Sequence, residues 1–353
     1  MASSIARLTA SAALATVVLT AATNTLTIYF VDVEGGQATL IVTAAGESLL
    51  VDAGFAGDGT FSSKAAEPRR ARDATRIRAA ALDAGIGRID YLVITHFHAD
   101  HDGGVPELAQ LIPIRTFVDH GTVGADAEQN VAGTLAAFNA YAAVRAKGRH
   151  IQPTPGQRLP LKGVDVRIVS SGGATLTRPL AGGGARNASC DSPATAAQEP
   201  HENPRSTGFV LTYGRFRFLD VGDLSGPPLF ALACPNDRVG PVDVYLVAHH
   251  GGVDAAVRPT FGAFKPRVAI VNNGATKGGS PDMFAALHAL PAVGDVWQLH
   301  RSQNPGAQNF PDDRIANLDD TTAHWIKITA RSDGSFDLVN GRTATAKTYA
   351  RGD

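Results

Sequence analysis

The side chains best suited to chemistry lie between Thr95 and Gly104. Within six residues, this stretch has four side chains of the kinds that bind metals: His96, His98, Asp100 and His101. Neutral imidazole and ionised carboxylate are the ligands that zinc and related ions take in proteins. The alternative is a polar loop that caps the next helix, but capping needs one Asp or Ser rather than several imidazoles. The motif therefore predicts metal binding.

The spacing within this motif predicts two neighbouring metal sites. Residues 89–94 read as a short strand, and Pro106 suits the first turn of a helix, so the motif occupies a strand-to-helix loop. In an extended segment residues two apart project to one side, so His96 and His98 should converge. Asp100 and His101 follow where the chain bends, and we expect them to face a second point nearby.

Two later strand ends supply further candidates. Asp223 follows a predicted hairpin of residues 208–213 and 215–221, where it suits a bridge between two ions or, alternatively, a cap for the next helix. A buried-type strand at 242–248 ends in His249 and His250. Neighbouring side chains on a strand point in opposite directions, so we expect only one of these two histidines to be a ligand.

The elements that must position these residues alternate between strands and helices. Three opening strands are expected to pair antiparallel, and the strand ending at residue 119 should return beside the metal loop by a crossover, which brings His120 to the same edge. The predicted strands are 25–33, 38–43, 47–54, 89–94, 114–119, 164–169, 208–213, 215–221, 242–248, 267–271, 296–300, 324–330 and 335–339. The predicted helices are 74–84, one starting near 105, 125–147 and 282–290.

Composition and the chain ends narrow the class of protein. The formal charge of -1 leaves no overall field to gather nucleic acid. Residues 1–22 carry one cation, then an uncharged stretch and small residues, which predicts a secretory signal peptide rather than a stable membrane span. We expect residues 23–353 to form a single domain, secreted or periplasmic, with an irregular loop at 170–205.

The chain has two cysteines, Cys190 and Cys234. An exported protein can use such a pair as one disulfide that holds the long loop, although the spacing alone does not fix the pairing. Neither cysteine has the sequence context of a metal ligand.

Taken together, the motifs resemble those of the metallo-β-lactamase superfamily. The resemblance rests on Leu50 to Gly54, the motif from His96 to His101, Asp223, and His249-His250-Gly251, in that order. Within the superfamily the chain is most similar to the ComEC-type competence-protein hydrolase domain. The resemblance implies an α/β fold, a four-layer αββα sandwich with the metals at one edge.

The resemblance also implies a division of ligands. His96 and His98 would serve one metal, Asp100 and His101 the other, and Asp223 would bridge them. One of the adjacent histidines would complete the second site, and the superfamily's usual His-Gly pair favours His250.

Many superfamily members carry a third histidine for the first metal, shortly before the bridging aspartate. Here Asn203 is nearest to that place, and asparagine is a poor zinc ligand. His201 and His120 are the other candidates to complete the first site.

The implied activity is hydrolysis by a hydroxide held between two zinc ions, with manganese or iron as possible replacements. Asp100 or His249 is the candidate to move the proton. We expect phosphoester substrates, phosphodiesters foremost. The alternatives are a lactamase or lactonase, or a binding protein in which the metals only hold the loops. The candidates on the substrate side are Lys277, Trp297 and His300.

Overall fold

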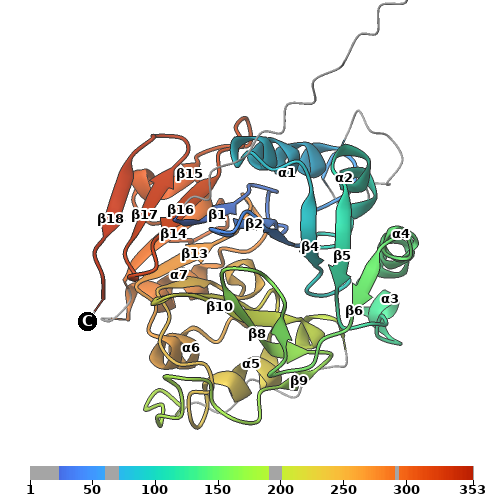
Figure 1. Cartoon of the computed structure of the whole chain (residues 1–353). Coiled ribbons are helices and arrows are strands. Elements are labelled where there is room, and N and C mark those ends of the chain that lie inside the picture. Colours follow the sequence, from blue (N-terminus) through green and yellow to red (C-terminus); the bar gives the residue numbers. More distant parts are fainter. Residues whose placement is uncertain (1–23, 60–70, 191–200, 291–293, 353) are drawn as a thin grey trace, which may run out of the picture.

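The computed structural model describes residues 24–59, 71–190, 201–290 and 294–352. Two large β-sheets dominate this part of the chain (Figure 1). The first has the strand order β18 (Ala346–Tyr349), β17 (Phe336–Asn340), β16 (Ile326–Ala330), β1 (Leu26–Phe30), β2 (Thr39–Val42), β3 (Ser48–Val51), β4 (Ile89–Val93), β5 (Ile114–Val118) and β6 (Arg149–Ile151). As predicted, its opening strands β1, β2 and β3 pair antiparallel.

The second sheet combines an antiparallel part with a parallel part. Its order is β15 (Ile315–Asn317), β14 (Asp295–His300), β13 (Val268–Val271), β12 (Val244–Leu246), β11 (Phe216–Asp220), β10 (Gly208–Tyr213), β8 (Asp165–Ser171) and β7 (Arg158–Leu159), with β9 (Ala174–Thr175) paired to β8. The predicted hairpin of β10 and β11 is present. From β11 to β15 every neighbouring pair is parallel, so these strands end at the same edge.

Three hydrophobic cores show that the two sheets and their helices form four layers. Alternation along β1 sends Ile28 and Phe30 into a core shared by both sheets, while Tyr29 faces the opposite side. That opposite side packs against α1 (Arg72–Asp83), α2 (Val105–Leu111) and α4 (Thr134–Arg145). A third core joins the second sheet to α5 (Gly226–Ala233), α6 (Val257–Phe264) and α7 (Pro281–His288). The predicted αββα sandwich is confirmed.

The crossover that carries the metal motif is also present. β4 and β5 pair in parallel, and α2 connects them. Parallel strands need such a connection, which leaves the loop after β4 at the carboxyl edge of the sheet.

Several predicted elements differ from the structure. The expected helix at 125–147 is two helices, α3 (Ala127–Asn130) and α4, because Gly133 between them adopts a left-handed backbone with φ 91°. The closing hairpin gains a third strand, β18, and helices α5 and α6 were not predicted. The predicted signal peptide lies outside the described residues, as do residues 191–200 of the expected loop.

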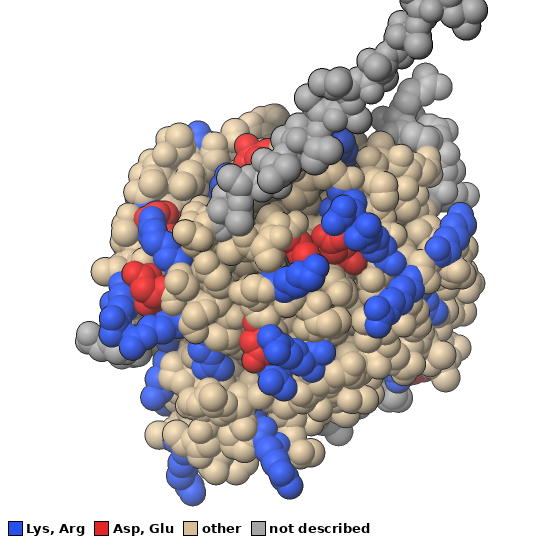
Figure 2. Space-filling model, viewed as in Figure 1, with Lys and Arg blue, Asp and Glu red and all other residues tan. Residues whose placement is uncertain are grey.

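No helix in the described ranges is long and apolar enough to cross a bilayer. On the face seen in Figure 2, the Lys and Arg side chains are spread out, with carboxylates and uncharged surface between them.

Candidate metal centre

Loops from both sheets bring the predicted ligands together at one edge of the sandwich. Asp100 and His101 follow β4, Asp223 follows β11, and His250 follows β12 in a short 3₁₀ turn, η3 (His249–Gly251). The candidate ligand atoms of these four residues all lie within 4.8 Å of one another. We refer to Asp100, His101, Asp223 and His250 as the four-ligand cluster.

Close approach of the two sheets depends on a glycine. Gly222 has φ +55°, and a Cβ atom there would lie 2.6 Å from the Cβ of Thr95, a contact that side chains do not make. Glycine therefore allows the loop carrying Asp223 to lie directly against the loop after β4. A backbone hydrogen bond from His249 N to Gly222 O, 3.1 Å, joins the η3 turn to the same place.

Two carboxylate oxygens lie between two imidazoles in the four-ligand cluster. Nε2 of His101 is 3.1 Å from Oδ2 of Asp100 and 3.2 Å from Oδ2 of Asp223. Nε2 of His250 is 3.3 Å and 3.2 Å from the same two atoms. Two nitrogens and two oxygens aimed at one point are a donor set that zinc accepts.

A second convergence lies beside the cluster. Nε2 of His96 is 2.9 Å from Nδ1 of His98, so the two rings present nitrogens to the same point, as the spacing in the sequence predicts. Oδ2 of Asp223 is 3.8 Å from Nε2 of His96. We call His96 and His98 the imidazole pair. The Asp223 carboxylate therefore lies between the imidazole pair and the other three residues of the four-ligand cluster.

The burial of these groups supports a cation at this place. Neither Oδ1 of Asp223 nor Nε2 of His250 has a hydrogen-bond partner among the described residues, although both residues are 2% exposed or less. Polar atoms buried without partners are costly, and a metal ion would satisfy them. The residues present therefore fit a metal of the zinc type.

The pKa directions of His96, His98 and Asp223 suit metal binding, whereas Asp223, Asp100 and Asp52 raise the pKa of His101 well above its usual range against the effect of burial. Burial is the main cause that lowers the pKa of His98, to about 4, and it holds the pKa of His96 well below its usual range, so both imidazoles are neutral at pH 7. Burial alone would raise the pKa of Asp223, but the neighbouring His101, His250 and His249 hold it well below its usual range. Neutral imidazole and ionised carboxylate are the forms that bind metal.

The buried carboxylate of Asp52 orients His101 within the four-ligand cluster. Nδ1 of His101 lies 2.7 Å from Oδ2 of Asp52, which leaves Nε2 facing the cluster. Asp52 also accepts hydrogen bonds from the backbone N–H and the hydroxyl of Thr95, both at 2.8 Å. Carboxylates that hold the far nitrogen of a ligand histidine fix its tautomer and direction. The sequence showed Asp52 only as part of a motif, without this contact.

His249 and His250 do not lie on a strand, so the expected alternation does not apply. Both residues have positive φ, 51° and 52°, and the chain turns sharply between them. His250 belongs to the four-ligand cluster, while Nε2 of His249 lies 3.7 Å from Oδ2 of Asp223. Nδ1 of His249 is 2.7 Å from Oδ1 of Asp254, which fixes the direction of the ring.

The three candidates for the first metal occupy different surroundings. His120 is buried and its Nε2 lies 3.0 Å from Oε2 of Glu202, so its ring contacts a carboxylate outside the four-ligand cluster. Asn203 lies next to His249, with Nδ2 3.2 Å from Nε2 of that ring. His201 lines the same pocket as Asn203.

A pocket of about 360 Å³ opens onto the candidate ligands. We call it the metal pocket; its described lining residues are His98, Asp100, Asn130, Val131, His201, Asn203, Asp223, His249 and Lys277. Nζ of Lys277 lies 2.5 Å from Oδ2 of Asp100 and donates to the carbonyl oxygen of Gly35 at 2.6 Å. Lys277 therefore lies at the metal pocket, while its contact with a substrate stays a prediction.

The other two substrate-side candidates were predicted wrongly. Trp297 is packed in the core between the sheets, and its Nε1 donates to the hydroxyl of Tyr349 at 3.1 Å. His300 is fully buried, with Nε2 2.7 Å from Oδ1 of Asp32. Both side chains are buried inside the fold, and neither is among the described residues that line the metal pocket.

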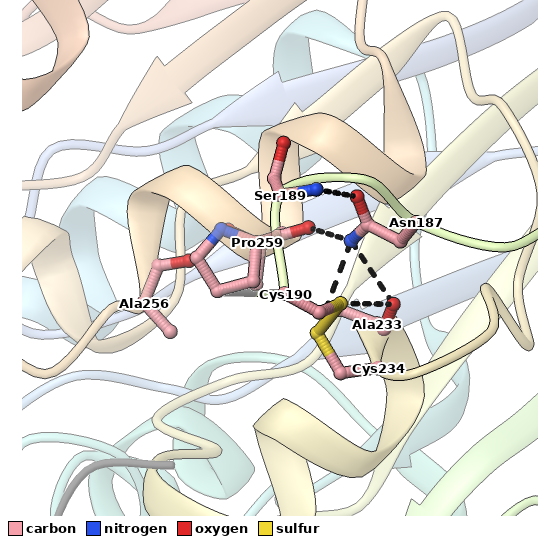
Figure 3. The surroundings of a disulfide bond; sticks show 8 residues. Asn187, Ser189, Cys190, Ala233, Cys234, Ala256 and Pro259 are labelled. Atoms are coloured by element: carbon pink, nitrogen blue, oxygen red, sulfur yellow. Dashed lines mark hydrogen bonds between the residues drawn. A yellow bond between two sulfur atoms is a disulfide. The ribbon is translucent and has the colours of Figure 1, made fainter. Parts of the chain in front are cut away.

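Cys190 and Cys234, whose pairing the sequence left open, form a disulfide (Figure 3). The Asn187 side chain lies beside it and donates to the carbonyl oxygens of Ala233 and Pro259, at 3.0 and 2.8 Å. The disulfide and this amide fasten the first part of the irregular loop to α5 and α6. Neither cysteine belongs to the four-ligand cluster.

Residues 31–173 match a family model described as the metallo-beta-lactamase superfamily. The chain has the metallo-β-lactamase fold. This match agrees with the resemblance seen in the sequence, whereas the closer likeness to the ComEC-type domain stays a prediction. A comparison with curated proteins finds no match.

Solved structures similar to this chain have diverse descriptions. A metallo-β-lactamase with an HARLDQ motif from Cronobacter sakazakii is 18% identical, with a TM-score of 0.32, over 57% of this chain and 61% of its own length. The metallo-β-lactamase-fold protein YhfI from Bacillus subtilis is 13% identical, with a TM-score of 0.45, over 78% and 95%. A diphosphatase of the PhnP family is 14% identical, with a TM-score of 0.39, over 77% and 94%.

Proposed function

We propose that this metallo-β-lactamase-fold protein is a metal-dependent hydrolase of phosphodiesters. The observation that carries the proposal is the position of Asp223. Its Oδ2 lies within 3.8 Å of Nε2 of His96 in the imidazole pair and within 3.2 Å of Nε2 of both His101 and His250. A carboxylate shared in this way suits two neighbouring cations. The proposed ions are two zinc ions, and manganese or iron would accept the same ligands.

In the proposed arrangement His96 and His98 would hold one ion, Asp100, His101 and His250 would hold the other, and Asp223 would be available to both. When bound, such a pair of ions supplies a nucleophilic water at neutral pH and stabilises the charge that develops on phosphorus.

The remaining residues have separate proposed tasks. His249 takes up or delivers a proton at Nε2, because Asp254 occupies its Nδ1. Nε2 lies between Asn203 and Asp223, which both line the metal pocket. Asp100 is the other proposed proton carrier. Lys277 adds a positive charge beside the pocket, where an anionic phosphodiester would bind.

The test combines metal analysis with a panel of substrates on the purified full chain. Bis(p-nitrophenyl) phosphate, a chromogenic β-lactam and a chromogenic lactone are assayed before chelation, after chelation and after zinc is returned. Diester turnover that disappears with the chelator and returns with zinc supports the proposal. Turnover of only the lactam or lactone would replace it with a different hydrolase, and bound metal without any turnover would favour a binding protein.

We also propose that residues 23–353 form one exported domain, secreted or periplasmic. The Cys190–Cys234 disulfide supports export, because such bonds persist in oxidising compartments. Fractionation of expressing cells, together with mass spectrometry of the mature amino terminus, tests this proposal. Protein that stays in the cytoplasm with residues 1–22 attached would contradict it.

A further inference from the structure

A second cavity of about 520 Å³ lies beside the metal pocket. We call it the side chamber, and His201 lines both cavities. Its described lining residues are Gly124, Ala125, Asp126, Gly172, Gly173, His201, Pro204, Arg205, Pro227 and Pro228.

The two cavities share two stretches of wall. Asp126 lines the chamber and Asn130 lines the metal pocket, and Nδ2 of Asn130 donates to Oδ2 of Asp126 at 2.9 Å. Along the other wall, Asn203 faces the pocket while Pro204 and Arg205, its next neighbours, line the chamber. The metal pocket and the side chamber are therefore direct neighbours.

The lining of the chamber is mostly uncharged. Seven of its ten described lining residues are glycine, alanine or proline, which offer flat apolar surfaces without donor side chains. Arg205 is already engaged by the protein, because its Nε lies 3.4 Å from Oε1 of Glu202 and its Nη2 donates to the carbonyl oxygen of Thr122 at 2.9 Å. The chamber therefore suits an uncharged group of the size of one or two rings.

The direction of the reaction decides which part of a diester would lie there. Asp100 and Asp223 of the four-ligand cluster line the metal pocket, so the phosphoryl group of a diester would lie against them. In an in-line displacement the attacking water and the leaving alcohol stand on opposite sides of phosphorus. The ester group that stays on phosphorus takes neither of these two directions, and the neighbouring side chamber offers it room.

We propose that the side chamber binds the uncleaved ester group of the substrate, and that this group is an uncharged aryl or bulky alkyl group. The inference rests on the proposed phosphodiesterase function and makes its substrate class more specific. Binding energy from such a non-reacting group is available to position the phosphoryl centre over the ligands.

The experiment compares two diesters that share one leaving group. Methyl p-nitrophenyl phosphate and 2-naphthyl p-nitrophenyl phosphate both release p-nitrophenol and differ only in the uncleaved group. The variant Ala125→Phe places a ring in the chamber at a position that is exposed, so the fold should tolerate it. The matched control is Ala136→Phe, at an exposed position of α4 that lines neither cavity.

We expect the unaltered protein to prefer the naphthyl ester in kcat/KM. Ala125→Phe should lower the ratio of naphthyl to methyl kcat/KM about tenfold or more, mainly through KM, and Ala136→Phe should leave the ratio unchanged. An unchanged ratio in Ala125→Phe would overturn the side-chamber proposal while leaving phosphodiester hydrolysis intact.

Calorimetric titration with 2-naphthol separates the chamber from the chemistry. Binding that is lost in Ala125→Phe and kept in Ala136→Phe, in a protein that cleaves no diester, supports the chamber and contradicts the proposed function. Failure of 2-naphthol to bind the unaltered protein, together with an unchanged ester ratio, contradicts the chamber alone.

Discussion

Two buried groups of histidine and carboxylate lie close together in this molecule, and they differ in how their polar atoms are satisfied. At Glu202 the carboxylate accepts from the backbone N–H of Gly124 at 2.6 Å and of Phe97 at 3.2 Å, and it pairs with His120. At Asp223, one carboxylate oxygen has no partner among the described residues. The same residue types thus build a closed structural pair in one place and an open ligand set in the other.

The electrostatic causes differ in the same way. Burial would raise the pKa of Glu202, but His120 and the Gly124 N–H lower it, and those groups belong to the fold itself. The pKa of Asp223 is lowered by nearby imidazoles against the effect of burial, and a bound cation would supply that positive charge while leaving the imidazoles neutral. We therefore expect Glu202 and His120 to hold the loops in place, whereas Asp223 and its neighbouring imidazoles should bind metal.

The strongest test of this comparison removes the shared carboxylate. Asp223→Ala should lower kcat/KM for bis(p-nitrophenyl) phosphate by about a thousandfold, the order of magnitude found when one charge-stabilising group is lost. Its metal content, measured by plasma mass spectrometry, should fall as well. Asp313→Ala, at an exposed aspartate far along the chain, is the control and should change neither quantity. Full activity in Asp223→Ala would contradict the proposal that Asp223 binds metal.

Metal removal should destabilise the fold through the same group. A ligand bound at a thousand times its Kd stabilises the native state by about 4 kcal/mol. For a domain of this size that corresponds to a fall in Tm on the order of 10 °C on chelation. Differential scanning calorimetry with and without a chelator measures it. Asp223→Ala should show little further change with chelator, and an equal shift in that variant would contradict the assignment.

A change at Glu202 should affect stability and leave the metal in place. Glu202→Gln should lower the free energy of unfolding by about 2 kcal/mol, because the buried His120 loses a charged partner. Denaturant titration measures the loss, and metal analysis should show the same content as the unaltered protein. Loss of metal in this variant would contradict the claim that Glu202 is structural and that only the Asp223 site binds metal.

The pH dependence of that loss has a definite sign. Because folding lowers the pKa of Glu202 from 4.5, its contribution is complete above about pH 4.5 and disappears as pH falls through the folded-state value. The difference in unfolding free energy between the unaltered protein and Glu202→Gln should therefore be constant near neutrality and shrink in acid. A difference that grows as pH falls would contradict this account.

The smallest expected effect concerns the orientation of His249. Asp254→Asn should lower kcat for the diester about fivefold to tenfold, because the amide no longer favours a proton on Nδ1 of His249. KM and metal content should stay close to those of the unaltered protein. A proportional change in KM and metal content would instead place Asp254 in the metal-binding structure.

How far the sequence predicts this site depends on how local each signal is. The ligands from His96 to His101 are adjacent in the chain, so their chemistry was visible directly, while Asp223 and His250 needed the expectation that strand ends meet. The contact of Asp52 with His101 joins residues 49 positions apart, and no local pattern reports it. His300 also stands at the end of a strand, as the last residue of β14, but its ring is buried against Asp32, 268 residues away in the sequence.

The prediction of helices and strands was limited in the same way, because it depended on local patterns. The patterns of apolar residues predicted most strands, since each strand carries its own pattern. The four-layer sandwich was instead what the resemblance to the superfamily implied. The predicted single helix at 125–147 failed at Gly133, where the backbone φ of 91° breaks a continuous run of alanine-rich helix. The short α5 and α6 are defined by packing on the second sheet rather than by long amphipathic repeats.

Asp52, His249 and His250 all have φ between 51° and 60°, a region that side chains other than glycine occupy at a cost of about 1–3 kcal/mol each. Glycine would relieve that cost at every one of these positions and would supply none of the ligand chemistry. A laboratory evolution experiment that rewards heat resistance alone should accumulate glycine there and lose the metal, whereas one that also rewards turnover should keep these residues and gain its stability elsewhere.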